Sequence, residues 1–289
     1  MYKQIAANKR NTVLIMIFFV VLIGIIGGIF AFAFHDWWIE VGILLIAIVY
    51  TVIQYDLSST LAVAMTGAKE IQKKDSPTYY NIVENLSQTA GLPMPKVCVI
   101  DDPAPNAFAT GRDPKHAVIA ATTGLLDIMD KNELEAVIGH ELSHIKNYDI
   151  RVSMITFGLV CIVGFVSDLG LRMSYYGNDD DRSPVGAVIL LVTAIFAPLA
   201  ASLAQLAVSR EREYLADASS VNLTRYPEGM IAALKKLDEH SRPMRRQNAA
   251  TEALYINNPL KKGTFSNLFS THPPIEKRIE RLENGKKTF

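Results

Sequence analysis

Cysteine is scarce in this sequence. Only Cys98 and Cys161 occur, the first in a polar region and the second inside an apolar stretch. Two cysteines in such different surroundings argue against a disulfide framework and against a cysteine-based metal site. Their scarcity also fits a reducing compartment for the polar part of the chain.

The sequence also lacks an excess of charge of either sign. Its 29 Lys and Arg residues balance 29 Asp and Glu residues, so bulk electrostatics gives no reason to expect nucleic-acid binding. No internal repeat or low-complexity tract is present. Apolar residues, by contrast, are plentiful: they make up 49% of the chain, and the mean hydropathy is +0.18. That is rich for a soluble protein of 289 residues.

Charged residues are almost missing from four long apolar runs. The third run contains Asp168 near its end, and the fourth contains one proline, Pro198. The first run is long enough to cross a hydrocarbon core of about 30 Å. We therefore expect an α-helical membrane anchor of four apolar helices. The runs are Val13 to Phe34, Val41 to Tyr55 with a continuation from Leu61 to Met65, Val152 to Leu171, and Val185 to Val208.

Two structures other than membrane helices could account for apolar runs of this kind. A cleaved signal peptide fits the first run poorly, because its apolar part is too long and no small-residue cleavage site follows it. The adjacent Trp37 and Trp38 instead fit an interfacial aromatic belt. For the third and fourth runs, a buried hairpin in a soluble core stays open as an alternative, since Asp168 and several glycines weaken the third run.

The distribution of lysine and arginine predicts the orientation in the membrane. The loop 35–40 has neither residue, and the loop 172–184 has only Arg172 and Arg182, diluted by three aspartates. Basic residues flank the other ends of the runs. By the positive-inside rule both termini and the polar regions are cytoplasmic, in a multi-pass protein of the cell (inner or cytoplasmic) membrane.

The apolar runs divide the chain into four parts. Residues 1–65 hold membrane helices 1 and 2, and residues 152–208 form a membrane hairpin of helices 3 and 4. Residues 66–151 and 209–289 form the two halves of a catalytic domain. Mixed short strands and helices in these halves predict an α+β domain. The expected strands are Lys96 to Ile100 and His116 to Ala121, and the expected helices are Ser76 to Thr89, 131 to 147, Arg210 to Leu223 and Glu228 to His240.

The helix expected at 131–147 carries a metal-binding pattern. Its start is marked by a capping box, Asp130 with Glu133 three residues later. His140 and His144 are four residues apart, so both imidazoles lie on one face and can bind one Zn²⁺. Bound zinc lowers the pKa of a water to about 7, and Glu141 is placed to accept the proton and pass it to the leaving amine.

A catalytic zinc site needs a third protein ligand. After the fourth apolar run, Glu213 and Asp217 are four residues apart and share a helix face. Glu213 could ligate the metal while Asp217 holds a ligand imidazole. The alternative is a solvated charged helix with pairs four residues apart, and spacing alone does not decide between them.

Taken together, these motifs resemble the HtpX-type membrane zinc metalloproteases of the HtpX and CAAX prenyl endopeptidase superfamily. The resemblance implies a zincin-like (gluzincin) domain with one Zn²⁺ per chain, Glu213 as third ligand and Asp217 as its helical partner. It also implies a cytoplasmic active site that degrades misfolded or damaged membrane proteins. The motifs are His140-Glu-Leu-Ser-His144, the block Ser209 to Asp217, Thr271-His-Pro-Pro274 and Pro105 to Gly111, so nearly the whole chain is covered.

Two further sites are predicted. In the resembling family the histidine at position 272 lies at the active site, where His272 could stabilise the oxyanion; a structural role in the Pro-Pro turn is the alternative. Zincins commonly bind an extended peptide along an edge strand. Asn106, Ala107 and Phe108 are the expected part of that substrate groove.

The predicted function is a membrane-embedded zinc-dependent endopeptidase. Its expected partners are polypeptide substrates, in particular membrane proteins, and the lipid bilayer, with no nucleic acid. One alternative is an inactive zincin-fold scaffold, against which the intact Glu141 and ligands argue. Another is a processor of lipidated C-termini, for which four apolar runs are few.

Overall fold

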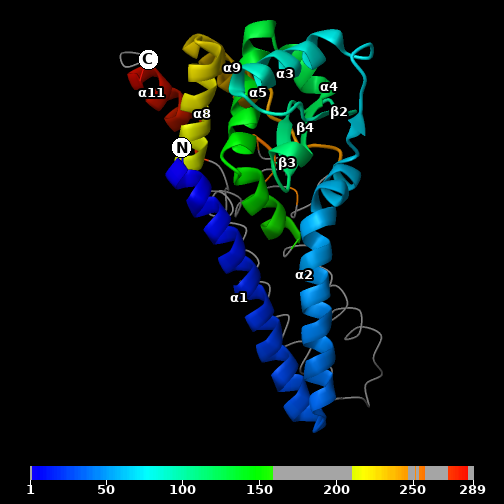
Figure 1. The fold of residues 1–289 in the computed structure, drawn as a ribbon. Helices are drawn as coiled ribbons and strands as arrows, with labels where there is room; N and C mark the ends of the chain where they lie inside the picture. The colour runs from blue at the N-terminus through cyan, green and yellow to red at the C-terminus, as the bar shows by residue number, and fades with distance from the viewer. Residues whose placement is uncertain (1, 159–209, 247–250, 252–253, 258–272, 286–289) are drawn as a thin grey trace.

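The computed structural model describes residues 2–158, 210–246, 251, 254–257 and 273–285. Two long helices, α1 (Tyr2–Phe34) and α2 (Trp37–Thr66), extend from a globular part that holds the sheet and the shorter helices (Figure 1). The start of α1 and the helix α11 (Ile275–Gly285) both lie at the globular end. The chain thus has a rod-like part and a compact part.

The two long helices have the properties of membrane spans. Ile5–Ile25 and Trp37–Gln54 are long and apolar enough to cross a bilayer. Many of their large apolar side chains are exposed, among them Ile25, Trp38 and Ile46. Asp36 is the N-cap of α2, and its side chain accepts a hydrogen bond from the N–H of Trp38. These helices match the first two predicted runs.

Of the four predicted membrane helices, only these two candidate spans fall within the residues that the structure describes. Residues 149–158 are helical and form the beginning of the third run. The remainder of that run and the fourth run lie outside the described residues. Two spans are therefore found where four were predicted.

A small mixed sheet forms one layer of the compact part. Its strand order is β1-β2-β4-β3. β2 and β4 are parallel, while β1 pairs with β2 and β3 pairs with β4 in antiparallel fashion. β3 is thus an edge strand. The strands are β1 (Lys69–Glu70), β2 (Lys96–Ile100), β3 (Ala107–Gly111) and β4 (Ala117–Thr122).

Helices cover the sheet, and most were predicted within one or two residues. The main core packs α3 and α5 against one sheet face, with Tyr79, Ile119, Val137 and Leu142 among its buried members. The opposite face packs against the end of α2 and residues of the helix at 149–158. The helices are α3 (Pro77–Ala90), α4 (Thr123–Ile128), α5 (Lys131–Lys146), α8 (Arg210–Thr224) and α9 (Pro227–Glu239).

The start of α5 is fixed by the predicted capping box. Asp130 accepts from the Glu133 N–H at 3.0 Å, and Glu133 accepts from the Asp130 N–H at 2.8 Å. Lys236 of α9 also reaches the Glu133 carboxylate, at 2.6 Å. Two of the donors that a helix start leaves unpaired are therefore satisfied.

A glycine lets α5 and α8 approach closely. A Cβ atom at Gly139 would come within 2.8 Å of the Ser220 hydroxyl oxygen. That hydroxyl donates to the backbone carbonyl of Ala136, one turn earlier on α5. The close approach brings the buried face of α8, with Glu213 and Asp217, onto the buried face of α5.

Candidate metal centre

Three side chains from α5 and α8 converge on one point. The Nε2 atoms of His140 and His144 are 3.1 Å apart. The Glu213 carboxylate places one oxygen 3.5 Å from each of these nitrogens. Ligand atoms from the three residues all lie within 4.8 Å of one another. Such a spacing suits donors arranged around a single ion.

The other ring nitrogen of each histidine is held by a carboxylate. Asp217 lies 2.9 Å from His140 Nδ1, and Asp149 lies 3.0 Å from His144 Nδ1. A carboxylate accepts, so each neutral ring carries its proton on Nδ1. Both Nε2 lone pairs then face the same point, which is the tautomer that metal ligation requires.

Arg278 of α11 closes the site from the side of Asp217. Its guanidinium makes a bidentate pair with the Asp217 carboxylate, at 2.9 and 2.6 Å. It also lies 3.9 Å from Glu213, and its side chain is 1% exposed. The C-terminal helix is thereby tied to the centre through a buried ion pair.

The buried charges around the centre fit a divalent cation. Among the described residues, the buried groups here include four carboxylates but only two guanidiniums. With both imidazoles neutral, two negative charges remain, and unpaired buried charge is costly. One Zn²⁺ would neutralise them, so the residues fit a metal ion by charge as well as by geometry. The carboxylates are those of Glu141, Asp149, Glu213 and Asp217, and the guanidiniums are those of Arg212 and Arg278.

The pKa values of the site residues reflect the same charge imbalance. Burial lowers the pKa of His140, but hydrogen bonds to Asp217 and Glu213 outweigh it and raise that pKa to about 9. Burial also lowers the pKa of His144, and Asp149 with Glu213 raises it above its usual value. Burial dominates at Glu141 and raises the pKa of this carboxyl. The cluster thus favours positive charge between the rings.

Glu141 faces the edge of the sheet as well as the histidines. The backbone of Ala109 in β3 is among the neighbouring groups that lower the pKa of its carboxyl. In the same strand the Asn106 carbonyl accepts from the Thr122 N–H of β4, so alternate residues point their main-chain groups away from β4. The side of β3 that faces away from β4 therefore lies near the predicted general base, and among the described residues no further strand of the sheet pairs with it.

The chain itself covers the first part of that edge. The Ile256 N–H donates to the Ala107 carbonyl at 3.0 Å, and Phe108 is paired with Tyr255. The Asn106 side chain makes two hydrogen bonds with the backbone of Asn257. It donates to the Asn257 carbonyl at 2.8 Å and accepts from the Asn257 N–H at 3.1 Å. The three residues predicted for the substrate groove thus contact residues 255–257 in this structure, and their role in binding substrate stays a prediction.

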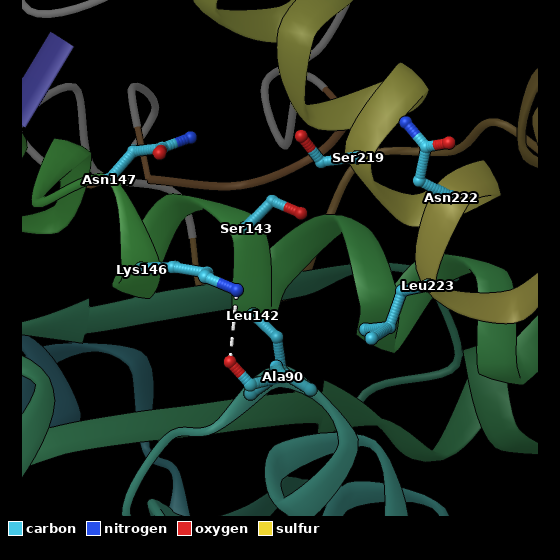
Figure 2. Close-up of a pocket in the computed structure, with 8 residues that line it drawn as sticks. All are labelled: Ala90, Leu142, Ser143, Lys146, Asn147, Ser219, Asn222 and Leu223. Atoms are coloured by element: carbon cyan, nitrogen blue, oxygen red, sulfur yellow. Dashed lines mark hydrogen bonds between the residues drawn. The ribbon is translucent and has the colours of Figure 1, made fainter. Parts of the chain in front are cut away.

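Two functional contacts escaped the sequence analysis. Asp149 holds the His144 ring, and Arg278 contacts both Asp217 and Glu213. His272 lies outside the described residues. A hollow of about 220 Å³ on the flank of α5, between α5 and α8, contains none of the three ligands (Figure 2). It is lined by Ala90, Leu142, Ser143, Lys146, Asn147, Ser219, Asn222 and Leu223.

Comparison with known families agrees with this geometry. The profile described as Peptidase family M48 matches residues 74–286, which include all three candidate ligands. The chain belongs to peptidase family M48. It is therefore a metallopeptidase, as the His-Glu-x-x-His pattern predicted, and a metal cofactor follows from the family.

Curated relatives match over nearly the whole chain of this M48 member. A "Protease HtpX homolog" of Tropheryma whipplei (strain Twist) is 53% identical over 285 residues, with 98% of each chain covered. Proteins of the same name from Streptococcus pyogenes serotype M5 and Ligilactobacillus salivarius are 48% and 45% identical, covering 98% of this chain and 99% of theirs. The predicted resemblance to HtpX-type proteases is confirmed.

A solved structure supports the fold of this M48 peptidase. The crystal structure of S. mikatae Ste24p aligns with a TM-score of 0.53 at 19% identity. The alignment covers 91% of this chain and 62% of Ste24p. Helices combined with a small mixed sheet are thus the shared architecture, and the two apolar helices α1 and α2 agree with a membrane metalloprotease.

Proposed function

We propose that this chain is a zinc-dependent endopeptidase with one Zn²⁺ bound by His140, His144 and Glu213. The convergence of these three side chains within 4.8 Å, each ring anchored through its other nitrogen, carries the proposal. Two imidazoles and one carboxylate are a known ligand set for catalytic zinc, and they leave a fourth position for water or substrate. Asp217 and Asp149 orient the rings.

The protein groups divide the reaction between them. Zinc, when bound, supplies a Lewis acid that makes a water nucleophilic near neutral pH. Glu141 accepts the proton of the attacking water and delivers it to the leaving nitrogen. Its burial and its raised pKa suit a group that must hold a proton between these two steps. His272 is proposed to donate a hydrogen bond to the oxyanion.

The substrate is proposed to bind as an extended strand along the free edge of β3. The Ala109 backbone lies close enough to Glu141 to affect its pKa, so a peptide paired along this part of β3 would place its scissile bond beside the base and the proposed zinc ligands. Residues Asn106 to Phe108 would form one end of this groove, next to the segment 255–257. The chain segments 66–151 and 209–289 together make up the catalytic domain, on either side of the membrane hairpin 152–208.

The test is the exchange of Glu141 for Gln. The amide keeps the size of the side chain but cannot accept a proton, so casein cleavage by detergent-purified protein should fall at least about a hundredfold. Zinc content should stay at one ion per chain. Glu135→Gln, on the same helix, is the matched control and should behave like the wild type. Near-wild-type turnover in Glu141→Gln would overturn the mechanism.

The same assay distinguishes the alternatives. An inactive scaffold would bind zinc and cleave nothing, whereas a processor of lipidated C-termini would prefer a prenylated peptide to casein.

We propose a cytoplasmic active site in the inner membrane and a role in quality control of membrane proteins. The basic flanks of the apolar runs and the similarity to HtpX homologues support these assignments.

A further inference from the structure

The first membrane helix reaches the metal centre through one side chain. Asn8, in the second turn of α1, is 4% exposed. Its amide nitrogen donates to the Asp149 carboxylate at 2.7 Å and to the Asn147 carbonyl at 2.9 Å. Figure 1 shows the start of α1 beside the lower end of α8, at the level where α5 ends. An amide from α1 is therefore buried against the turn that follows the metal helix.

The contact of Asn8 continues directly to a candidate ligand. One oxygen of Asp149 accepts from Asn8, and the other holds Nδ1 of His144 at 3.0 Å. Arg212 of α8 lies 3.8 Å from the Asn8-bonded oxygen. Rotation of the Asp149 carboxylate is thus restricted from two sides, and its orientation sets that of the His144 ring.

The turn that carries Asp149 needs such support. Tyr148 adopts a φ of 62°, a left-handed conformation that is unfavourable for a residue other than glycine. The Lys9 ammonium lies 4.6 Å from the centre of its ring. Asn8 and Lys9 of α1 therefore fasten three consecutive residues of this turn, 147 to 149.

We propose that Asn8 is a positioning residue for the metal centre, which makes metal affinity depend on the docking of α1 against the catalytic domain. Both partners of the Asn8 nitrogen are acceptors, so the interaction requires an N–H donor. Aspartate has the same shape but only acceptors, and it would place a second negative charge beside Asp149. The proposal rests on the zinc site proposed above.

The experiment compares Asn8→Asp with Asn11→Asp in the full-length protein in detergent. Asn11 is exposed on the same helix, so its exchange adds the same charge without reaching the centre. Zinc affinity is measured by competition with a chromophoric chelator. We expect about a tenfold or greater loss in Asn8→Asp, the lower bound for partners of metal ligands, and none in Asn11→Asp.

Two further measurements separate positioning from a general loss of stability. The Co²⁺-substituted protein should change its visible absorption in Asn8→Asp, because the His144 ring is displaced, while Asn11→Asp keeps the wild-type spectrum. The exchange Asn8→Asp combined with Asp149→Asn restores a donor–acceptor pair and should recover part of the lost affinity. Only the monodisperse, folded fraction of each variant is used.

The outcomes are distinguishable. Wild-type zinc affinity and an unchanged cobalt spectrum in folded Asn8→Asp would overturn the positioning role while leaving the zinc site intact. Equal losses in Asn8→Asp and Asn11→Asp would also overturn it, since charge alone would then be the cause. Failure of the wild-type protein to bind zinc would instead refute the proposed function itself.

Discussion

The two candidate imidazoles are held by different parts of the chain. His140 is 1% exposed and is anchored through Asp217 to Arg278, on the last described helix. The His144 side chain is 15% exposed and is anchored through Asp149 to the first helix. Each ring thus has its own support, and loss of one support should leave the other in place.

The third ligand is testable by a pair of exchanges on α8. Glu213→Ala removes the carboxylate that faces both imidazoles and should lower zinc affinity severely, because two histidines and water make a poor zinc site. Glu211→Ala, whose side chain is 75% exposed, should change little. Zinc stoichiometry after dialysis against a weak chelator is the measurement. Full retention in Glu213→Ala would show that another residue is the ligand.

Arg278 should matter for folding before metal binds. Arg278→Gln leaves the Asp217 carboxylate buried without its counter-charge, which costs about 3–5 kcal/mol in comparable sites. The thermal midpoint of the zinc-depleted protein should fall by several degrees. Arg281→Gln, on the same helix but with a side chain that is 57% exposed, should shift it far less. Equal midpoints for the two variants would contradict this account.

The sequence-based prediction and the structure differ most for the individual side chains that support the candidate ligands. His140 and His144 are four residues apart, so helical periodicity alone placed both imidazoles on one face, with Glu141 next to them in the sequence. Asn8, Asp149 and Arg278 act through contacts that span more than 60 residues, or through a turn whose shape is set by distant groups. No local pattern distinguishes such an asparagine or arginine from its exposed neighbours.

At the scale of elements, the packing of α5 on α8 positions the ligands. Gly139→Ala would push a methyl group to within 2.8 Å of the Ser220 hydroxyl, so this hydroxyl must leave its bond to Ala136 or α8 must shift, and we expect α8 to shift. Since Glu213 lies on α8, zinc affinity should drop about tenfold or more, as when ligand partners are displaced. Chelator competition measures the change.

A double exchange provides the control for this clash. Ser220→Ala removes the nearest atom, so the combination with Gly139→Ala should recover part of the affinity, whereas Ser220→Ala alone should have little effect. Alanine is otherwise a better helix former than glycine by about 1 kcal/mol. An unchanged affinity together with a higher thermal midpoint in Gly139→Ala would show that the approach of the helices is not limiting.

The helices and strands themselves were largely readable from the sequence. Capping residues and periodicity gave α5 and β2 with correct starts, because these signals are local. The pairing of Tyr255 with Phe108 was not predicted. It joins segments about 150 residues apart, and no tight turn between them marks the pairing in the sequence. The residues predicted for the substrate groove, Asn106 to Phe108, are therefore covered by residues 255–257, which the sequence did not indicate.

For the whole molecule, the direction of the chain through the membrane can be tested. Reporter fusions after Glu40 and after Asp180 should both read as non-cytoplasmic, because the loops that hold them are poor in lysine and arginine. A fusion after Asp75, in the compact part, should read as cytoplasmic. Glu40 lies at the start of α2, far from the sheet in Figure 1, whereas Asp180 lies outside the described residues. A cytoplasmic signal at Asp180 would mean that the hairpin does not cross.

The tie between Asp217 and Arg278 has a consequence for how the protein is made. The ribosome makes α1 and α2 before the two histidines of α5, and it makes α11 after them. Until then Asp217 has no guanidinium beside it, and His140 lacks a fixed support. A growing chain therefore carries the candidate metal ligands without a finished centre. Proteolysis should begin only after α11 has been made and has packed beside α8, so unfinished copies would spare the nascent proteins around them.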